Sequence, residues 1–186
     1  MRHASVAAVV LSLAVALPEL ARADARNVGL GVAGGIAWSG SKVDLQSAKN
    51  TATSASEKIG SRPAWGFFVD IPLLPTFYIS PAAMLYTVKA DVDGTTRPVT
   101  DLDLNFKFIV PIGDLHLGAG LTAGLSAGLP TKPNGYVPHV GGLGYLSYNL
   151  VANLDAFMLL QYKRQMVENA PAIDDIHAFV GGMFRF

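Results

Sequence analysis

The stretch Ile176-His177-Ala178-Phe179-Val180-Gly181-Gly182-Met183-Phe184-Arg185-Phe186 ends the sequence and decides its fold class. Every second residue from Ile176 onward is apolar or glycine, whereas the intervening set contains the polar side chains of His177 and Arg185. A period of two indicates a β-strand, because successive side chains point to opposite faces. A free strand edge ending in aromatic residues favours aggregation in water, whereas in a membrane barrel the apolar face contacts lipid. The stretch therefore predicts the last strand of a transmembrane β-barrel, with a soluble sandwich or lipocalin-like barrel as the alternative.

The same alternation recurs along the rest of the chain. The clearest case is the segment from Asp101 to Phe108, in which Leu102, Leu104 and Phe106 interleave with charged and amide side chains. Strands are predicted over 27–39, 62–71, 77–89, 101–108, 115–126, 139–150, 154–164 and 176–186. A tilted strand of about ten residues crosses the hydrocarbon of a bilayer. The pattern predicts an all-β fold, an eight-stranded antiparallel up-and-down transmembrane β-barrel.

The connections between these strands alternate in length. Long polar loops are expected over 40–61, 91–96, 127–138 and 165–175, and short turns over 72–75, 111–114 and 151–153. Outer-membrane barrels have short periplasmic turns and long external loops. We therefore expect both ends of the barrel domain in the periplasm and the long loops outside the cell.

The N-terminus resembles a secretory signal peptide. A basic head at 1–3 precedes an uncharged apolar stretch over 4–17, and Ala21-Arg22-Ala23 has small residues where a signal peptidase cleaves. We expect a signal peptide over 1–23 and a single barrel domain over 24–186. One of 14 acidic and two of 14 basic residues would leave with the signal, so the domain has a net charge of −1 and no basic surface for nucleic acid. Cysteine is absent, so no disulfide is available.

Two motif matches have a simpler explanation. Gly29-Leu30-Gly31-Val32-Ala33-Gly34 fits the dinucleotide-binding pattern, but these glycines fall inside an alternating strand and open no helix. The second match is Gly120-x-x-x-Gly124, the pattern of paired transmembrane helices. Its uncharged segment 115–129 is too short for a transmembrane helix, which needs about 20 residues. We therefore predict no cofactor, and we interpret the small residues of 29–37 as space for Phe68, Phe179 and Arg185 inside a narrow barrel.

Taken together, the chain resembles the small outer-membrane β-barrel superfamily, the group of the opacity proteins and the OmpA transmembrane domain. The resemblance rests on the terminal 181–186 segment and on the 111–120 hairpin. It implies that the C-terminal strand is a signal for the outer-membrane assembly machinery, and that the protein lies in the outer membrane of a Gram-negative bacterium in contact with outer-membrane lipid. The residues that match this signal are Ile176, Ala178, Val180, Phe184 and Phe186, whereas Gly182 departs from it.

The predicted inward faces carry charges that need partners. Eight strands enclose a lumen that side chains fill, so an open pore is not favoured. Unpaired charges there are costly, so we expect ion pairs in a filled interior rather than a gate or proton path. The predicted polar network of the lumen comprises Asp70, Asp103, Lys107, Asp155, Lys163 and Arg185, and the inward set also includes Asp101, His116 and His177.

Catalytic and metal-binding residues are not predicted from sequence. The His-x-Ser pair of the barrel lipid deacylases is absent, because His116, His139 and His177 lack a serine two positions later. Ser126, His139 and Asp174 are all expected near the external rim, but sequence does not establish that they converge. The histidines also lack the spacing of metal ligands. We predict a structural or surface-interaction role through the external loops, with a surface partner for 40–61. A lipid-modifying enzyme and a soluble periplasmic ligand-binding barrel are the alternatives.

Overall fold

Each alternating segment forms a β-strand in the computed structural model, which describes residues 28–40, 62–89, 96–129, 134–166 and 172–186. The expected signal peptide and nearly all of the predicted loop 40–61 lie outside these residues. The strands are β1 (Gly29–Gly40), β2 (Arg62–Leu74), β3 (Phe77–Lys89), β4 (Thr96–Ile112), β5 (Leu115–Ala127), β6 (Tyr136–Val151), β7 (Leu154–Gln165) and β8 (Ile173–Arg185). Among the described residues there is no helix that is long and apolar enough to cross a membrane.

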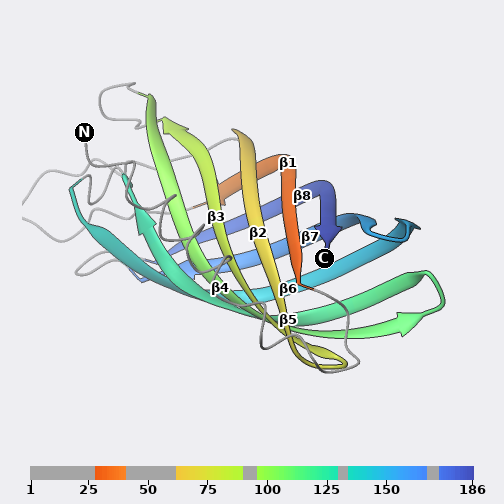
Figure 1. Ribbon diagram of the computed structural model, residues 1–186. Helices are drawn as coiled ribbons and strands as arrows, with labels where there is room; N and C mark the ends of the chain where they lie inside the picture. The colour runs from red at the N-terminus through yellow and green to blue at the C-terminus, as the bar shows by residue number, and fades with distance from the viewer. Residues whose placement is uncertain (1–27, 41–61, 90–95, 130–133, 167–171) are drawn as a thin grey trace, which may run out of the picture.

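The strands form one closed antiparallel barrel in sequence order. β1 pairs with β2 on one side and with β8 on the other, where Gly29 lies opposite Arg185 and Gly40 opposite Asp174. Figure 1 shows β1, in orange, between the yellow β2 and the dark blue β8. Closure gives every strand two neighbours and removes the free edges of the sheet. The predicted fold class is confirmed.

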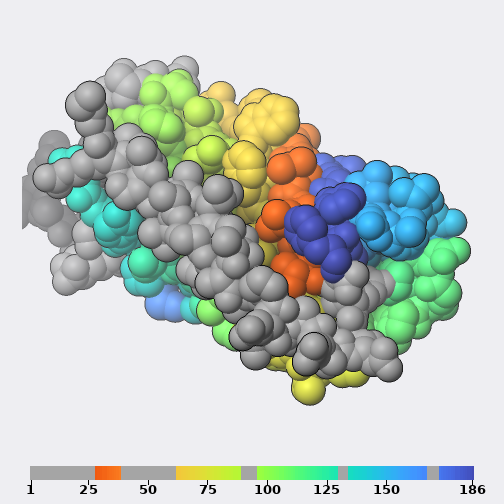
Figure 2. All heavy atoms as spheres, in the orientation of Figure 1, coloured from red at the N-terminus to blue at the C-terminus, as the bar shows by residue number. Residues whose placement is uncertain are grey.

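The two faces of the barrel differ sharply. Side chains such as Leu121, Val180 and Trp65 on the outside are 61 to 68% exposed. The inward side chains of β4, among them Asp101, Asp103 and Lys107, are at most 6% exposed. This arrangement confirms the predicted facing of β4, and on β3 the inward face is that of Tyr78, Ser80, Met84 and Tyr86. Figure 2 shows the dark blue C-terminal residues on this outer surface, beside β1.

Several element ends differ from the sequence prediction. β2 continues through the predicted turn to Leu74, because a register shift between Pro72 and Leu74 absorbs the proline, and the turn falls on Pro75 and Thr76. β4 likewise continues to Ile112, and the turn falls on Gly113, whose positive φ of 64° suits glycine, and Asp114. β6 begins at Tyr136 and β8 at Ile173, each earlier than expected, because these residues still pair with neighbouring strands.

The bare inner face of β1 makes room for large side chains, as the sequence suggested. A Cβ on Gly35 would lie 2.8 Å from a ring carbon of Phe179, and one on Gly29 would lie 3.2 Å from a guanidinium nitrogen of Arg185. Small residues on β1 therefore allow β8 to direct its long side chains into a narrow lumen.

Two glycines of β6 provide a matched test of strand contact. A Cβ on Gly141 would lie 1.8 Å from the backbone oxygen of Tyr162, whereas one on Gly144 meets nothing within 4 Å. We expect Gly141→Ala to lower the free energy of unfolding by about 1–3 kcal/mol or to prevent folding, because β7 must move away. Gly144→Ala should unfold at the wild-type urea concentration. Equal stability of the two variants in a detergent refolding titration would contradict the register of β6 and β7.

Candidate functional site

The charged side chains near the short turns form one ion-paired group, which we call the turn-end cluster: Asp70, Lys107, Asp155 and Arg185. Lys107 Nζ forms an ion pair with Asp70 Oδ1. Arg185 Nε lies 2.5 Å from Asp155 Oδ2, and Arg185 Nη2 lies 3.6 Å from Asp70 Oδ2. Ser80 Oγ also donates a hydrogen bond to Asp70, at 2.7 Å. The cluster contains two carboxylates and two cations, so its charges balance within a buried volume.

A second group, the loop-end cluster, lies farther along the strands and comprises Asp101, Asp103, His139 and Lys163. Lys163 Nζ bridges the two carboxylates, at 2.9 Å from Asp101 Oδ2 and 2.7 Å from Asp103 Oδ2. His139 Nε2 lies 2.7 Å from the other oxygen of Asp103. All four side chains are at most 6% exposed. With a neutral His139 this cluster has a net charge of −1, and a protonated imidazole brings it to zero.

The loop-end cluster includes a serine–histidine–aspartate sequence of contacts. Ser126 Oγ lies 2.9 Å from His139 Nδ1, and His139 Nε2 contacts Asp103. These are the distances of a nucleophile, a base and an orienting carboxylate. However, Ser126 is 0% exposed and His139 is 1% exposed, so no substrate reaches the hydroxyl in this structure. Serine and aspartate contact the ring nitrogens opposite to those of the Ser-His-Asp triad, and the arrangement works here as part of a buried hydrogen-bond network.

Aromatic side chains fill the lumen at intermediate positions of the strands. Phe68 packs edge-to-face against Phe157 and Phe179, with ring centroids 5.4 and 5.8 Å apart. Phe157 also stacks on Tyr145 at 5.9 Å, and Lys107 Nζ lies 4.4 Å from the centroid of the Tyr145 ring. On β7, Phe157 lies between Asp155 of the turn-end cluster and Lys163 of the loop-end cluster. The rings therefore separate the two charged clusters with apolar material.

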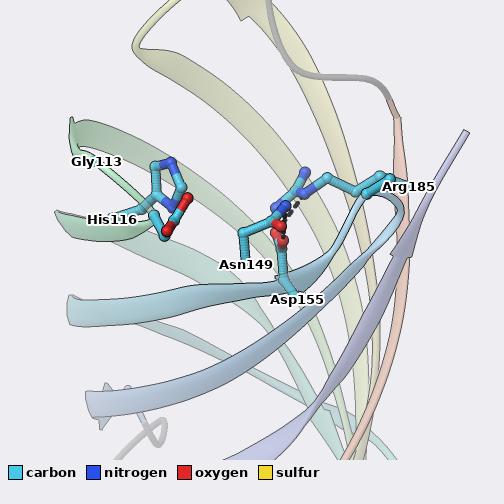
Figure 3. A pocket seen from close by; sticks show the side chains of 7 residues that line it. Gly113, His116, Asn149, Asp155 and Arg185 are labelled. Atoms are coloured by element: carbon cyan, nitrogen blue, oxygen red, sulfur yellow. Dashed lines mark hydrogen bonds and ion pairs between the residues drawn. The ribbon is translucent and has the colours of Figure 1, made fainter.

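A cavity of about 440 Å³ opens at the turn end of the barrel. Figure 3 shows His116 on one side of it and Asn149, Asp155 and Arg185 together on the other. Asn149 Nδ2 donates to Asp155 Oδ1 at 3.2 Å, so both groups are already engaged. Of the turn-end cluster, Asp155 and Arg185 line this cavity.

The structure places every residue of the predicted lumen network inside the barrel, but in two groups. Asp70, Lys107, Asp155 and Arg185 come together at the turn end, and Asp103 and Lys163 come together at the loop end. Asp174, which was expected near the same rim as Ser126 and His139, faces outward and accepts a hydrogen bond from Tyr162 Oη at 2.7 Å. Asp103 contacts His139 instead, because only β5 separates β4 from β6 and the inward side chains of these two strands meet in the lumen.

Sequence reasoning missed His139, Gln161 and Asn105 as members of the network. Gln161 Nε2 donates to Asn105 Oδ1 at 2.8 Å and lies 3.4 Å from Asp103 Oδ2. The available signal was their inward phase, since Asn105 and Gln161 fall on the same face as charged neighbours in their own strands, whereas the strand of His139 contains no charged residue. Register between strands, which sequence does not give, decides which of these residues meet.

The outward face of β8 carries the residues of the expected assembly signal. Ile176, Val180 and Phe184 are 44 to 61% exposed, and Phe186 is 60% exposed. The rings of Phe184 and Phe186 lie edge-to-face with centroids 5.2 Å apart. Ala178 is half-buried on the same face. These side chains form an apolar strip at the surface rather than part of the core.

One group in the described residues has the donor atoms of a metal site. An oxygen from each of Asp101 and Asp103 and a nitrogen of His139 lie within 4.8 Å of one another. Sequence analysis predicted no metal-binding residues, because these donors come from β4 and β6 without local spacing. Lys163 currently bridges the two carboxylates.

Comparison with solved structures identifies the fold. The crystal structure of Neisserial surface protein A matches with a TM-score of 0.60 and 12% sequence identity, over 86% of this chain and 97% of that one. The outer membrane protein OprG from Pseudomonas aeruginosa matches with a TM-score of 0.53 and 15% identity, over 87% and 97% of the two chains. No protein-family model and no curated protein matches the sequence. The chain thus has the fold of the small eight-stranded outer-membrane β-barrels.

The pair Asp70 and Lys107 provides a test of charge balance. We expect Asp70→Leu alone to cost about 3–5 kcal/mol of unfolding free energy, because it leaves the Lys107 ammonium buried without its partner. Adding Lys107→Met should recover most of this loss, because Arg185 keeps Asp155 as its partner. Urea titrations of both single variants and the double variant measure the coupling. Additive losses in the double variant would show that the pair is not the source of the cost.

Proposed function

We propose that the protein is an integral outer-membrane barrel with a structural or surface-interaction role, exerted through the segments that connect its strands at the loop end. This proposal rests on the distribution of polar and apolar side chains, which is the reverse of that in a soluble barrel. Charged and amide side chains are buried inside, and large apolar side chains cover the outside. A soluble lipocalin-like barrel has the opposite arrangement, with an apolar interior and a polar surface. Lipid is the solvent that suits this surface.

The filled lumen argues against a channel as the main activity. The two ion-paired clusters and the aromatic rings between them occupy successive positions along the strands. Opening a water-wide path would require breaking buried ion pairs, each of which is costly to separate. The packed interior suits a rigid scaffold better than a pore.

The same packing argues against hydrolysis. Ser126 has a base and a carboxylate in line, but its hydroxyl lies inside the barrel wall at 0% exposure. Binding specificity on rigid scaffolds usually resides in the connecting loops. The segment 41–61 is the longest connection between strands in this chain, so we propose that it carries the contact with a surface partner. Neisserial surface protein A, which shares the fold, is a surface protein by its name.

Measurements on the purified, refolded protein separate the three functional classes. We expect no steady conductance in planar bilayers, no labelling of Ser126 by a fluorophosphonate probe, and unchanged acyl chains in the lipid of an overexpressing strain. Deletion of 43–59 should leave heat-modifiable migration intact and remove binding of cells to other surfaces. Steady large conductance, Ser126 labelling or a missing acyl chain would overturn the proposal, as would undiminished surface binding by the deletion variant.

We also propose that β8 is the strand recognised by the outer-membrane assembly machinery, through the outward strip of Ile176, Ala178, Val180, Phe184 and Phe186. The strip is apolar and exposed, and it ends in paired aromatic rings. Main-chain and alternate side-chain contacts are how an extended strand is recognised. The departure at Gly182 leaves a gap within the strip.

Removal of Phe186 tests this assignment. We expect the shortened chain to refold in detergent like the wild type but to be assembled in cells at a several-fold lower level, because the machinery loses its terminal anchor. Tyr148→Ala is the matched control, since Tyr148 is an exposed aromatic side chain on β6. Quantification of heat-modifiable protein in outer-membrane fractions gives the result. Equal assembly of all three proteins would contradict the role of Phe186.

A further inference from the structure

We propose that the loop-end cluster is a binding site for one divalent transition-metal ion, with Asp101, Asp103 and His139 as ligands. The three side chains extend into the lumen from β4 and β6, and their donor atoms lie within 4.8 Å of one another. Carboxylate oxygen and imidazole nitrogen together are the donor set of zinc and its neighbours in the first transition series. This inference is independent of the surface role proposed above.

The charge of the cluster points to a cation. Two carboxylates face one ammonium, so a neutral His139 leaves a net charge of −1 inside the barrel, in contrast to the balanced turn-end cluster. Buried charge without compensation is costly. Lys163 already shows that a cation is stable between the two carboxylates. A metal ion there would compete with the ammonium, because both neutralise the same oxygens.

Ser126 has the position of an orienting partner for a metal-binding histidine. Ligating histidines usually engage an oxygen through the other ring nitrogen, which fixes the tautomer. Ser126 Oγ lies 2.9 Å from His139 Nδ1, so a proton on Nδ1 leaves Nε2 free to bind an ion. In the metal-free state Nε2 donates a hydrogen bond to Asp103. When the metal ion binds Nε2, this proton moves to Nδ1 or leaves the imidazole. Zinc holds tetrahedral ligands about 3.3 Å apart, so the 2.7 Å contact between Nε2 and Asp103 must widen slightly.

His177 is a further unused donor at the same level of the lumen. Its side chain is 0% exposed, and neither ring nitrogen has a hydrogen-bond partner. Its ring lies edge-to-face against Tyr86, with centroids 5.0 Å apart, and Tyr86 Oη donates to Asp101 at 3.3 Å. The charged and titratable groups that act on it are Lys163, Asp101, Asp103 and His139. This buried imidazole has no hydrogen-bond partner, although its nitrogens are not among the donor atoms that lie within 4.8 Å of one another.

Metal binding by the full barrel tests the proposal. The untagged protein is refolded in detergent with Zn²⁺ or Co²⁺, since the donors are buried, and is then freed of excess ion by gel filtration. We expect one ion per folded chain by elemental analysis and, for Co²⁺, the visible absorption of a nitrogen- and oxygen-ligated site. Asp103→Asn and His139→Gln should weaken binding at least about tenfold, and Lys163→Met should strengthen it. His116→Gln is the control, because it removes a lumen histidine distant from the cluster.

The outcomes decide the proposal in each case. Absence of a stoichiometric ion in the wild-type barrel overturns it, whatever Lys163→Met binds. Equal binding by His139→Gln and the wild type overturns it as well, since the ion then lies elsewhere. If Asp103→Asn and His139→Gln do not fold, judged by heat-modifiable migration, Ser126→Ala replaces them. That variant keeps all ligands, and an affinity about 10–100-fold lower supports the site, whereas unchanged affinity overturns it.

Discussion

Closure of the sheet through β1 and β8 is the constraint on which the rest of this structure depends. It satisfies the strand edges, as lipid requires, and it fixes the width of the interior. Because eight strands enclose little more than their own side chains, each inward residue must fit against residues from several other strands. The bare inner face of β1 and the long side chains of β8 are one consequence, since Gly29 and Gly35 leave the volume that Arg185 and Phe179 occupy.

The narrow interior also explains how the charges are arranged. In a wide lumen water would solvate Asp70 or Lys163, whereas here each must find a protein partner. The result is two clusters separated by Phe68, Phe157 and Phe179. Buried ion pairs of this kind add little net stability compared with apolar packing, but removing one partner is strongly destabilising because it leaves a buried charge uncompensated.

His139 is the residue on which interpretations of the lumen differ. With Ser126 and Asp103 it forms a serine–histidine–aspartate set of residues, and with Asp101 and Asp103 it presents metal ligands. Burial separates these possibilities, because a nucleophile must meet a substrate whereas an ion can be enclosed during folding. The chemistry of the cluster therefore depends more on which molecules or ions can reach its groups than on the groups themselves. Its cation, at present Lys163, holds both carboxylates in place.

The sequence by itself determined which residues face lipid and which face the lumen. On β4, Leu104 and Phe106 point outward, and Asp103 and Lys107 point inward, because side-chain direction follows directly from a local period of two. Glycine and proline marked the turns, with errors of a few residues where β2 accommodates Pro72 through a register shift. Only the tertiary structure decided which inward residues meet. Asp103 and His139 are 36 positions apart, and their contact depends on register and barrel closure, whereas Asp174, which was expected near the same rim, lies on the outer face. Pairing across a lumen depends on all strands at once, and no local pattern carries that information.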